Sequence, residues 1–215
     1  EQSLDSVKMR MENLLEYKCI NKAPKIKIVK GSLFGFSVLE LHCEKSDEKT
    51  LFGFFQGVFI SDREVKLALN SYIKGIIRTR LLDILDDFKV IIYTALAKGS
   101  NEKSQLALHQ DASYVDENTD YSMSLWIPLS DSNLENGAIH ILEGSHTTFP
   151  TIRCATMVHD YGDSEAIKSK MKCIEVKAGE ALLFHSRLLH YTPKNTSGTI
   201  RMAVMSCLLR SDADI

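Results

Sequence analysis

The sequence predicts a mainly β fold with flanking helices, of the double-stranded β-helix (jelly roll) type. Many short β-favouring runs separated by turn formers fill the second half, without the helices that alternate with strands in a parallel sheet. A helix-rich N-terminal part, about 1–90, is expected to pack on a jelly-roll core, about 89–210. No linker rich in proline, glycine or serine separates these parts, so residues 1–215 are expected to form one domain.

The N-terminal part begins with a predicted helix at Ser3–Lys18, where apolar residues recur at helical spacing. Short β-like runs follow over Ile26–Phe59. The clearest helix is Ser61–Phe88, which Ser61 or Asp62 can cap and whose apolar residues again recur at helical intervals.

The remaining chain reads as strands and one further helix, Asp163–Met171. The predicted strands are Lys89–Ala97, Tyr121–Pro128, Ala138–Leu142, Ile174–Lys177, Ala181–Phe184, Leu188–Thr192 and Thr199–Leu209. The turn formers of "PKNTSG" predict a hairpin between the last two strands. In that hairpin His190 pairs with Arg201 and Thr192 pairs with Thr199, so that His190, Thr192 and Arg201 share one face.

Composition excludes several classes of function. Of the 215 residues, 44% are hydrophobic and 25% are charged, as in ordinary globular proteins. The net charge of -2 gives no basic surface for nucleic acid, and no apolar run suits a membrane span or signal peptide, so neither partner is expected. Five scattered cysteines without a C-x-x-C motif favour reduced thiols in a cytoplasmic setting. The oligomeric state stays open.

Polar residues gather in "LALHQDASY". His109 and Asp111 are two residues apart, so on extended backbone both project to the same side. With one distant histidine they supply the 2-His-1-carboxylate set that holds ferrous iron and leaves coordination positions open. Taken alone, H-x-D also arises by chance, with His109 capping a turn and Asp111 in solvent. Arg201 favours the functional interpretation, because a buried guanidinium needs an anion and no neighbouring carboxylate in the sequence supplies one.

The order H-x-D, "NGAIHILEGSH" and "AGEALLFHSRLLHYTPKNTSGTIR" resembles the phytanoyl-CoA hydroxylase family of Fe(II)/2-oxoglutarate dioxygenases, over Ala97–Leu209. The resemblance implies that His109, Asp111 and His190 ligate Fe(II). His185 is then a structural histidine.

The same resemblance implies the co-substrate contacts. Arg201, eleven residues after His190 (201 − 190 = 11), is expected to bind the distal carboxylate of 2-oxoglutarate, helped by the Thr192 hydroxyl. Trp126 matches an aromatic position near the co-substrate. "EGSH" departs from the family's P-G-[ST]-H, since Glu143 replaces proline, and is expected to form a tight turn in which His146 has no metal role.

The implied reaction uses O2 and converts 2-oxoglutarate to succinate and CO2 while a substrate is hydroxylated at an unactivated C–H bond. Because Asp111 keeps its carboxylate, hydroxylation is favoured over halogenation, whereas desaturation or ring formation stays open. No CoA or phosphate motif is recognisable in the N-terminal half, which favours a small-molecule substrate such as an amino acid or specialised metabolite.

Two alternatives belong to other classes. One is a cupin-like metalloenzyme that does not use 2-oxoglutarate, and the spacing of Arg201 disfavours it. The other is a non-catalytic jelly-roll binding module, which the complete ligand set disfavours.

Overall fold

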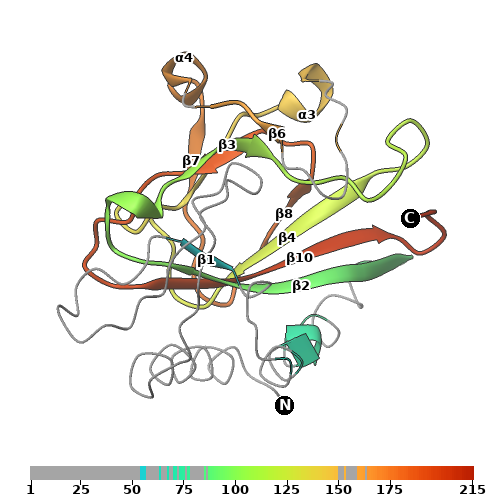
Figure 1. The fold of residues 1–215 in the computed structure, drawn as a ribbon, viewed down its shortest axis with the longest axis horizontal. Helices are drawn as coiled ribbons and strands as arrows, with labels where there is room; N and C mark the ends of the chain where they lie inside the picture. The colour runs from blue at the N-terminus through green and yellow to red at the C-terminus, as the bar shows by residue number, and fades with distance from the viewer. Residues whose placement is uncertain are drawn as a thin grey trace.

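The computed structural model describes residues 54–56, helical positions between 63 and 77, residue 85, and residues 87–149, 153, 159–162 and 164–215 (Figure 1). The predicted helix Ser3–Lys18 and most of Ile26–Phe59 lie outside these residues. The positions described between 63 and 77 are helical, as the sequence predicts, and Ile73 and Ile77 are buried.

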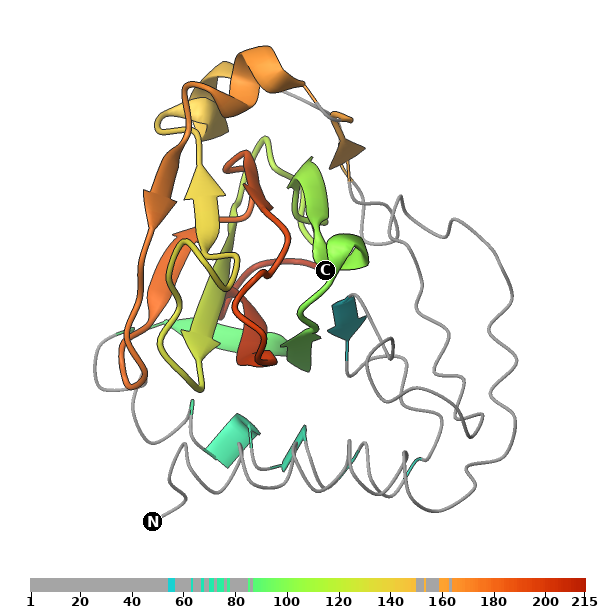
Figure 2. The same cartoon turned by 90° about the vertical axis from the view of Figure 1, so that its left-hand side faces the viewer.

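The described strands form two five-stranded antiparallel sheets that face each other (Figure 2). The first sheet has the order β1-β2-β10-β4-β8, with strands Phe54–Gln56, Phe88–Lys98, Arg201–Arg210, Ser122–Pro128 and Leu182–His185. The second has the order β6-β3-β9-β5-β7, with strands His159–Asp160, Leu106–Gln110, His190–Thr192, Ile139–Ile141 and Lys172–Ile174. Sequential strands alternate between the sheets from β2 to β5 and again from β7 to β10, which confirms the predicted jelly roll.

Short helical turns lie between these strands: the 3-10 turn Glu102–Ser104, α3 (Ser145–Thr148) and α4 (Glu165–Lys168). The helix α4 is shorter than the predicted Asp163–Met171. The motif "EGSH" forms the entry to α3, where Gly144 has a φ of 74°. No helix among the described residues is long and apolar enough to cross a bilayer.

Some predicted boundaries are wrong. The helix expected to reach Phe88 ends earlier, because Asp87 forms a turn with a φ of 60° and β2 begins at Phe88. The strand expected at Ile174–Lys177 is β7, three residues long and ending at Ile174, while Val176 makes an isolated bridge to Ser132. The alternation of apolar and polar residues does not show where a strand ends, because the end depends on how far the partner strand pairs with it.

The predicted hairpin at "PKNTSG" is also wrong. β9 pairs with β3 and β5, whereas β10 pairs with β2 and β4, so this segment crosses from one sheet to the other. His190 therefore lies opposite His109, and Arg201 lies opposite Lys98. The buried amide of Asn195 shapes the crossing by donating to the carbonyls of Lys98 and Thr199, at 3.1 and 2.7 Å. The same turn formers suit a hairpin and a crossing, so local composition could not separate them.

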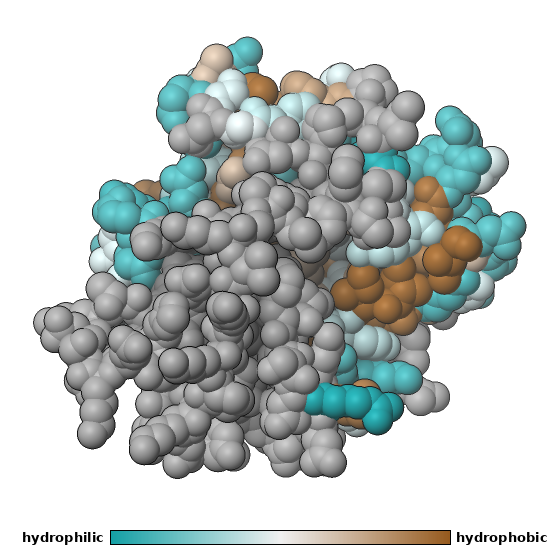
Figure 3. All heavy atoms as spheres, viewed as in Figure 1, coloured by the Kyte–Doolittle hydropathy of each residue, from teal (hydrophilic) through white to brown (hydrophobic). Residues whose placement is uncertain are grey.

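The hydrophobic core fills the space between the sheets. Leu96 and Ala203 face it from the first sheet together with Trp126, and Ile139 faces it from the second. On the face shown in Figure 3, the described residues include a hydrophobic area on the right with hydrophilic residues above and below it. A buried polar cluster lies in the same interior.

Candidate active site

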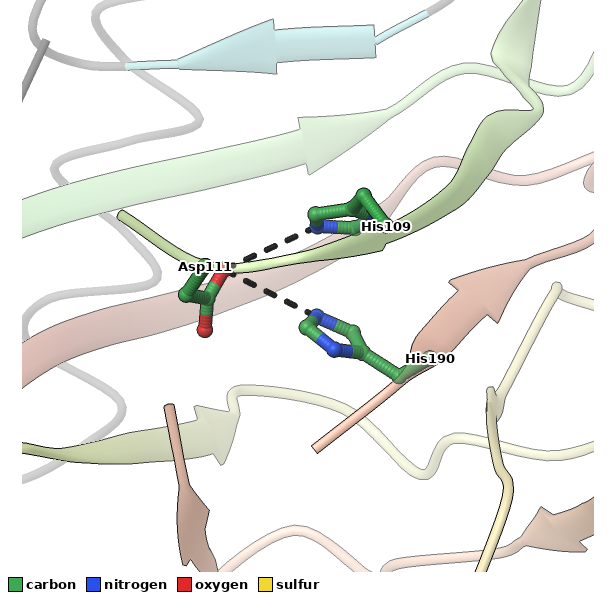
Figure 4. Close-up of side chains that lie close together, drawn as sticks. All are labelled: His109, Asp111 and His190. Atoms are coloured by element: carbon green, nitrogen blue, oxygen red, sulfur yellow. Dashed lines mark ion pairs between the residues drawn. The ribbon is translucent and has the colours of Figure 1, made fainter. Parts of the chain in front are cut away.

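His109, Asp111 and His190 lie together at one end of the space between the sheets (Figure 4). His109 is on β3, Asp111 directly follows that strand, and His190 is its neighbour on β9. The Nε2 atoms of His109 and His190 lie 3.6 and 3.7 Å from Oδ1 of Asp111, and one donor atom from each residue lies within 4.8 Å of the others. All three side chains are buried. Their donor atoms converge as a single metal ion requires.

The backbone sets the orientation of both imidazole rings. Nδ1 of His109 lies 2.7 Å from the carbonyl oxygen of Ala107, and Nδ1 of His190 lies 2.9 Å from that of Leu188. A carbonyl only accepts, so in both rings Nδ1 carries the hydrogen and Nε2 is the nitrogen that faces Asp111. Burial, followed by the charge of His109, lowers the pKa of His190 to about 4, so His190 is neutral at pH 7. A neutral imidazole is the form that ligates a metal.

The Asp111 carboxylate is held from the other sheet. Ser124 on β4 donates to Oδ2 of Asp111 at 2.5 Å and also lies 3.1 Å from the hydroxyl of Ser186. Burial by itself raises the pKa of Asp111, but the adjacent His190 and His109 and the Ser124 hydrogen bond outweigh it and hold the pKa at about 2. At neutral pH the site therefore offers the neutral imidazole of His190 and the anionic carboxylate of Asp111, next to the imidazole of His109.

Arg153 braces the backbone at Asp111. Its Nη1 donates to the carbonyl oxygens of Asp111 and Ser186, the latter at 2.9 Å. Its Nη2 pairs with the Glu117 carboxylate, which also pairs with Arg187 at 3.2 Å. The Arg153 side chain is completely buried. This network ties the end of β3 to the turn before β9.

Arg201 is also buried between the sheets, at the start of β10. It is 2% exposed, and its Nη1 donates to the carbonyl oxygen of Gly137 at 2.5 Å. Its guanidinium carbon is 5.1 Å from the centre of the Trp126 ring. Among the described residues Arg201 forms no ion pair, its buried Nε has no hydrogen-bond partner, and burial lowers its pKa to about 10. A buried guanidinium without an ion-pair partner among the described residues favours the binding of an anionic ligand.

Thr192 on β9 is buried in the same interior and accepts a hydrogen bond from Nζ of Lys98 at 2.8 Å. Lys98 is fully buried at the end of β2, directly opposite Arg201. Gly137 packs against it, since a Cβ on this glycine would lie 2.5 Å from Cε of Lys98. Its φ of +78° also lies in the left-handed region, which glycine adopts without the steric cost that a side chain brings.

Two further described histidines, His185 and His140, lie outside the cluster. His185 is outside the metal cluster: its Nδ1 accepts from the Arg187 backbone N–H at 3.0 Å, and its ring stacks between Tyr121 and His146. His140 contacts Tyr191 on β9, with ring centres 4.9 Å apart.

Several residues of this region were not identified from the sequence. Ser124 lies two residues before Trp126 on β4, and residues two apart on a strand share a face. Ser124 could therefore have been assigned to the same interior face. Lys98 ends a strongly apolar run, but the predicted strand stopped one residue earlier. Arg153 and Glu117 come from loops, where no periodicity indicates a facing partner.

A family model described as phytanoyl-CoA dioxygenase (PhyH) matches residues 56–203, more than half of the chain. The chain belongs to the phytanoyl-CoA dioxygenase family. A Dictyostelium discoideum phytanoyl-CoA dioxygenase domain-containing protein 1 homolog is 27% identical over 117 residues, covering 50% of this chain and 42% of the relative. The Arabidopsis thaliana phytanoyl-CoA dioxygenase is 31% identical over 108 residues, covering 48% and 38%. The matches thus span only about two fifths of these relatives.

Solved structures share the fold. AviO1 from Streptomyces viridochromogenes Tue57 superposes with a TM-score of 0.59 at 16% identity, covering 99% of this chain and 86% of AviO1. EvdO2 from Micromonospora carbonacea var. aurantiaca, solved in complex with 2-oxoglutarate, gives a TM-score of 0.52 at 18% identity and covers 68% and 66%. At identities of 16–18% these superpositions establish only that this chain has the same jelly-roll fold.

Proposed function

We propose that this chain is an Fe(II)/2-oxoglutarate-dependent dioxygenase that hydroxylates an unactivated C–H bond of a small molecule, such as an amino acid or specialised metabolite. Membership of the phytanoyl-CoA dioxygenase family supports the class of reaction. The observation that carries the proposal is the buried cluster of His109, Asp111 and His190 between the same sheets as the buried Arg201, which has no anionic partner among the described residues.

The donor set fits ferrous iron. Two imidazole nitrogens and one carboxylate oxygen occupy one side of a metal and leave positions for 2-oxoglutarate and O2. When bound, the iron would activate O2 at the expense of 2-oxoglutarate, which becomes succinate and CO2. Because Asp111 keeps its carboxylate and Ser124 fixes it, no coordination position is left vacant by a missing side chain, which supports hydroxylation over halogenation.

The protein's own residues would bind and orient the co-substrate. Arg201 would pair with the distal carboxylate of 2-oxoglutarate, a planar anion that suits its planar fork. Thr192 would add a hydroxyl donor, and the Trp126 ring would hold the guanidinium in place from one side. The hydrophobic core around them would limit access of water to the reacting centre.

An anaerobic titration tests the proposal. Adding 2-oxoglutarate to the Fe(II)-loaded protein should give a weak visible charge-transfer band, and aerobic incubation should release succinate even without the true substrate. Arg201→Ala should weaken 2-oxoglutarate binding by roughly tenfold or more, because charge-assisted hydrogen bonds are lost. A cupin-like metalloenzyme would bind iron without responding to 2-oxoglutarate, and a binding module would show no iron-dependent band.

Substrate class is tested separately. 2-Oxoglutarate consumption, followed as succinate release against a library of amino acids and specialised metabolites, should rise above the uncoupled level for the true substrate class. No increase with any small molecule, together with an increase for acyl-CoA thioesters, would overturn this part of the proposal.

A further inference from the structure

Lys98 is an unusual residue for the interior of a β sandwich. It is 0% exposed, and its ammonium group donates to the backbone carbonyl of Ser104 at 2.5 Å and to Oγ1 of Thr192 at 2.8 Å. Lysine is almost never fully buried, since removing an ammonium group from water is costly. Its stem also leaves no room for a side chain at Gly137. The fold therefore buries the Lys98 side chain beside Arg201, its partner on the neighbouring strand.

We propose that Lys98 is a positioning residue of the co-substrate pocket, which directs the Thr192 hydroxyl and adds its charge to that of Arg201 so that the pocket selects 2-oxo acids with a distal carboxylate. This inference rests on the proposed function. It assigns to Lys98 a role that neither the metal cluster nor Arg201 requires.

The hydrogen bonds around Thr192 and Arg201 leave two buried donors without an acceptor among the described residues. An ammonium group only donates, so Lys98 engages a lone pair of Thr192 Oγ1. The hydroxyl hydrogen of Thr192 must then point to another acceptor, and no acceptor among the described residues bonds to it. Nε of Arg201 is a second buried donor without an acceptor in the described part of the chain. Two such donors favour the binding of a ligand that accepts hydrogen bonds, as a carboxylate does.

Two basic side chains lie next to each other in this interior. Lys98 and Arg201 are opposite each other on antiparallel strands, which brings their side chains to the same face of the sheet. Burial, and then the neighbouring Arg201, hold the pKa of Lys98 well below its ordinary value. An anion placed between the two groups would relieve this repulsion. A 2-oxo acid that ends in a methyl group would not.

The test compares two ligands on Fe(II)-loaded protein by anaerobic calorimetry. 2-Oxoglutarate carries the distal carboxylate, and 2-oxopentanoate has the same carbon chain with a methyl group in its place. Lys98→Met should raise the Kd of 2-oxoglutarate by roughly tenfold or more, which is the scale of a lost charge-assisted hydrogen bond. The Kd of 2-oxopentanoate should stay nearly unchanged. In a Thr192→Val background, Lys98→Met should raise the Kd by a smaller factor, because the hydroxyl it directs is already absent.

A purely structural role for Lys98 would give a different result. It would weaken both 2-oxo acids equally, or lower the melting temperature without changing the preference between them, and either outcome would overturn the proposal. Folding should survive, since replacing a buried cation by an apolar side chain of similar length is often neutral or stabilising. Should Lys98→Met fail to fold, Lys98→Gln keeps a neutral donor and should show an intermediate loss of preference; an unchanged preference there would equally refute the role.

The wild type separates this inference from the proposed function. If the wild type binds 2-oxoglutarate no better than 2-oxopentanoate, the proposed function fails. If Arg201→Ala loses the preference while Lys98→Met keeps it, only the inference about Lys98 fails.

Discussion

Ser124 donates a hydrogen bond to Oδ2 of Asp111 at 2.5 Å, while Oδ1 of the same carboxylate faces both imidazoles of the cluster. The serine belongs to the first sheet, and Asp111 follows a strand of the second. This contact fixes which oxygen is presented to a metal, and it joins the two sheets at the point where the ligands converge.

Ser124→Ala should therefore weaken Fe(II) binding by about tenfold, because hydrogen-bond partners of metal ligands typically contribute on that scale. Anaerobic titration with Fe(II) measures the change. Ser206→Ala is the matched control, since Ser206 is also a buried β-strand serine but its hydroxyl has no partner among the described residues. Equal losses in both variants would mean that Ser124 contributes only to packing.

The two histidines at either end of the turn before β9 should behave differently. His190→Ala removes a proposed ligand and should abolish succinate release and the iron-dependent band. His185→Ala should retain both, because His185 only accepts from the Arg187 backbone and stacks on Tyr121 and His146. Activity retained in His190→Ala but lost in His185→Ala would reverse the assignment.

The metal-free protein should lose stability as the pH falls from about 6.5 to 4. The folded-state pKa of His190 is lowered to about 4, so across this range the unfolded chain takes up a proton that the folded protein excludes. His190 accounts for a decrease of up to about 3 kcal/mol in the free energy of unfolding over this range. Urea denaturation at pH 7, 6 and 5 measures it, and His190→Asn should flatten the slope; an unchanged slope in this variant would assign the effect to other groups.

Arg153→Met should destabilise the protein by about 3 kcal/mol or more, because it leaves the Glu117 carboxylate less compensated in a buried setting. Fe(II) affinity should fall as well, since the Asp111 carbonyl loses its donor. The double variant Arg153→Met/Glu117→Gln should recover part of the stability but not the metal affinity. Full recovery of both, measured by urea denaturation and Fe(II) titration, would show that Arg153 serves only to neutralise Glu117.

Gly137→Ala should cost more stability than Gly198→Ala, although both glycines have a φ near +80°. A left-handed backbone conformation alone costs about 1–2 kcal/mol for alanine. At Gly198 nothing lies within 4 Å of the added Cβ, whereas at Gly137 the Cβ would lie 2.5 Å from both Lys98 Cε and the Pro193 carbonyl oxygen. Thermal unfolding of both variants tests the difference, and equal melting temperatures would contradict the close packing around Lys98.

The family motif made the metal cluster predictable. His109 and Asp111 are close in sequence, and two-residue spacing on an extended strand brings both side chains to one side whatever the rest of the fold does. The structure brings the distant His190 to them, and Arg201 is buried as its apolar neighbours indicated.

Local residues could not decide which strand pairs with which. Turn formers at "PKNTSG" show that the chain reverses, but a hairpin and a crossing between sheets use the same residues. Only the packing of the whole sandwich placed β9 against β3 and β10 against β2, and this pairing sets Lys98 opposite Arg201. The polypeptide sequence by itself determined the class of fold and the chemistry of the ligands. The tertiary structure decided the surroundings of Lys98, Ser124 and Arg153, because their partners come from distant segments that no local pattern links.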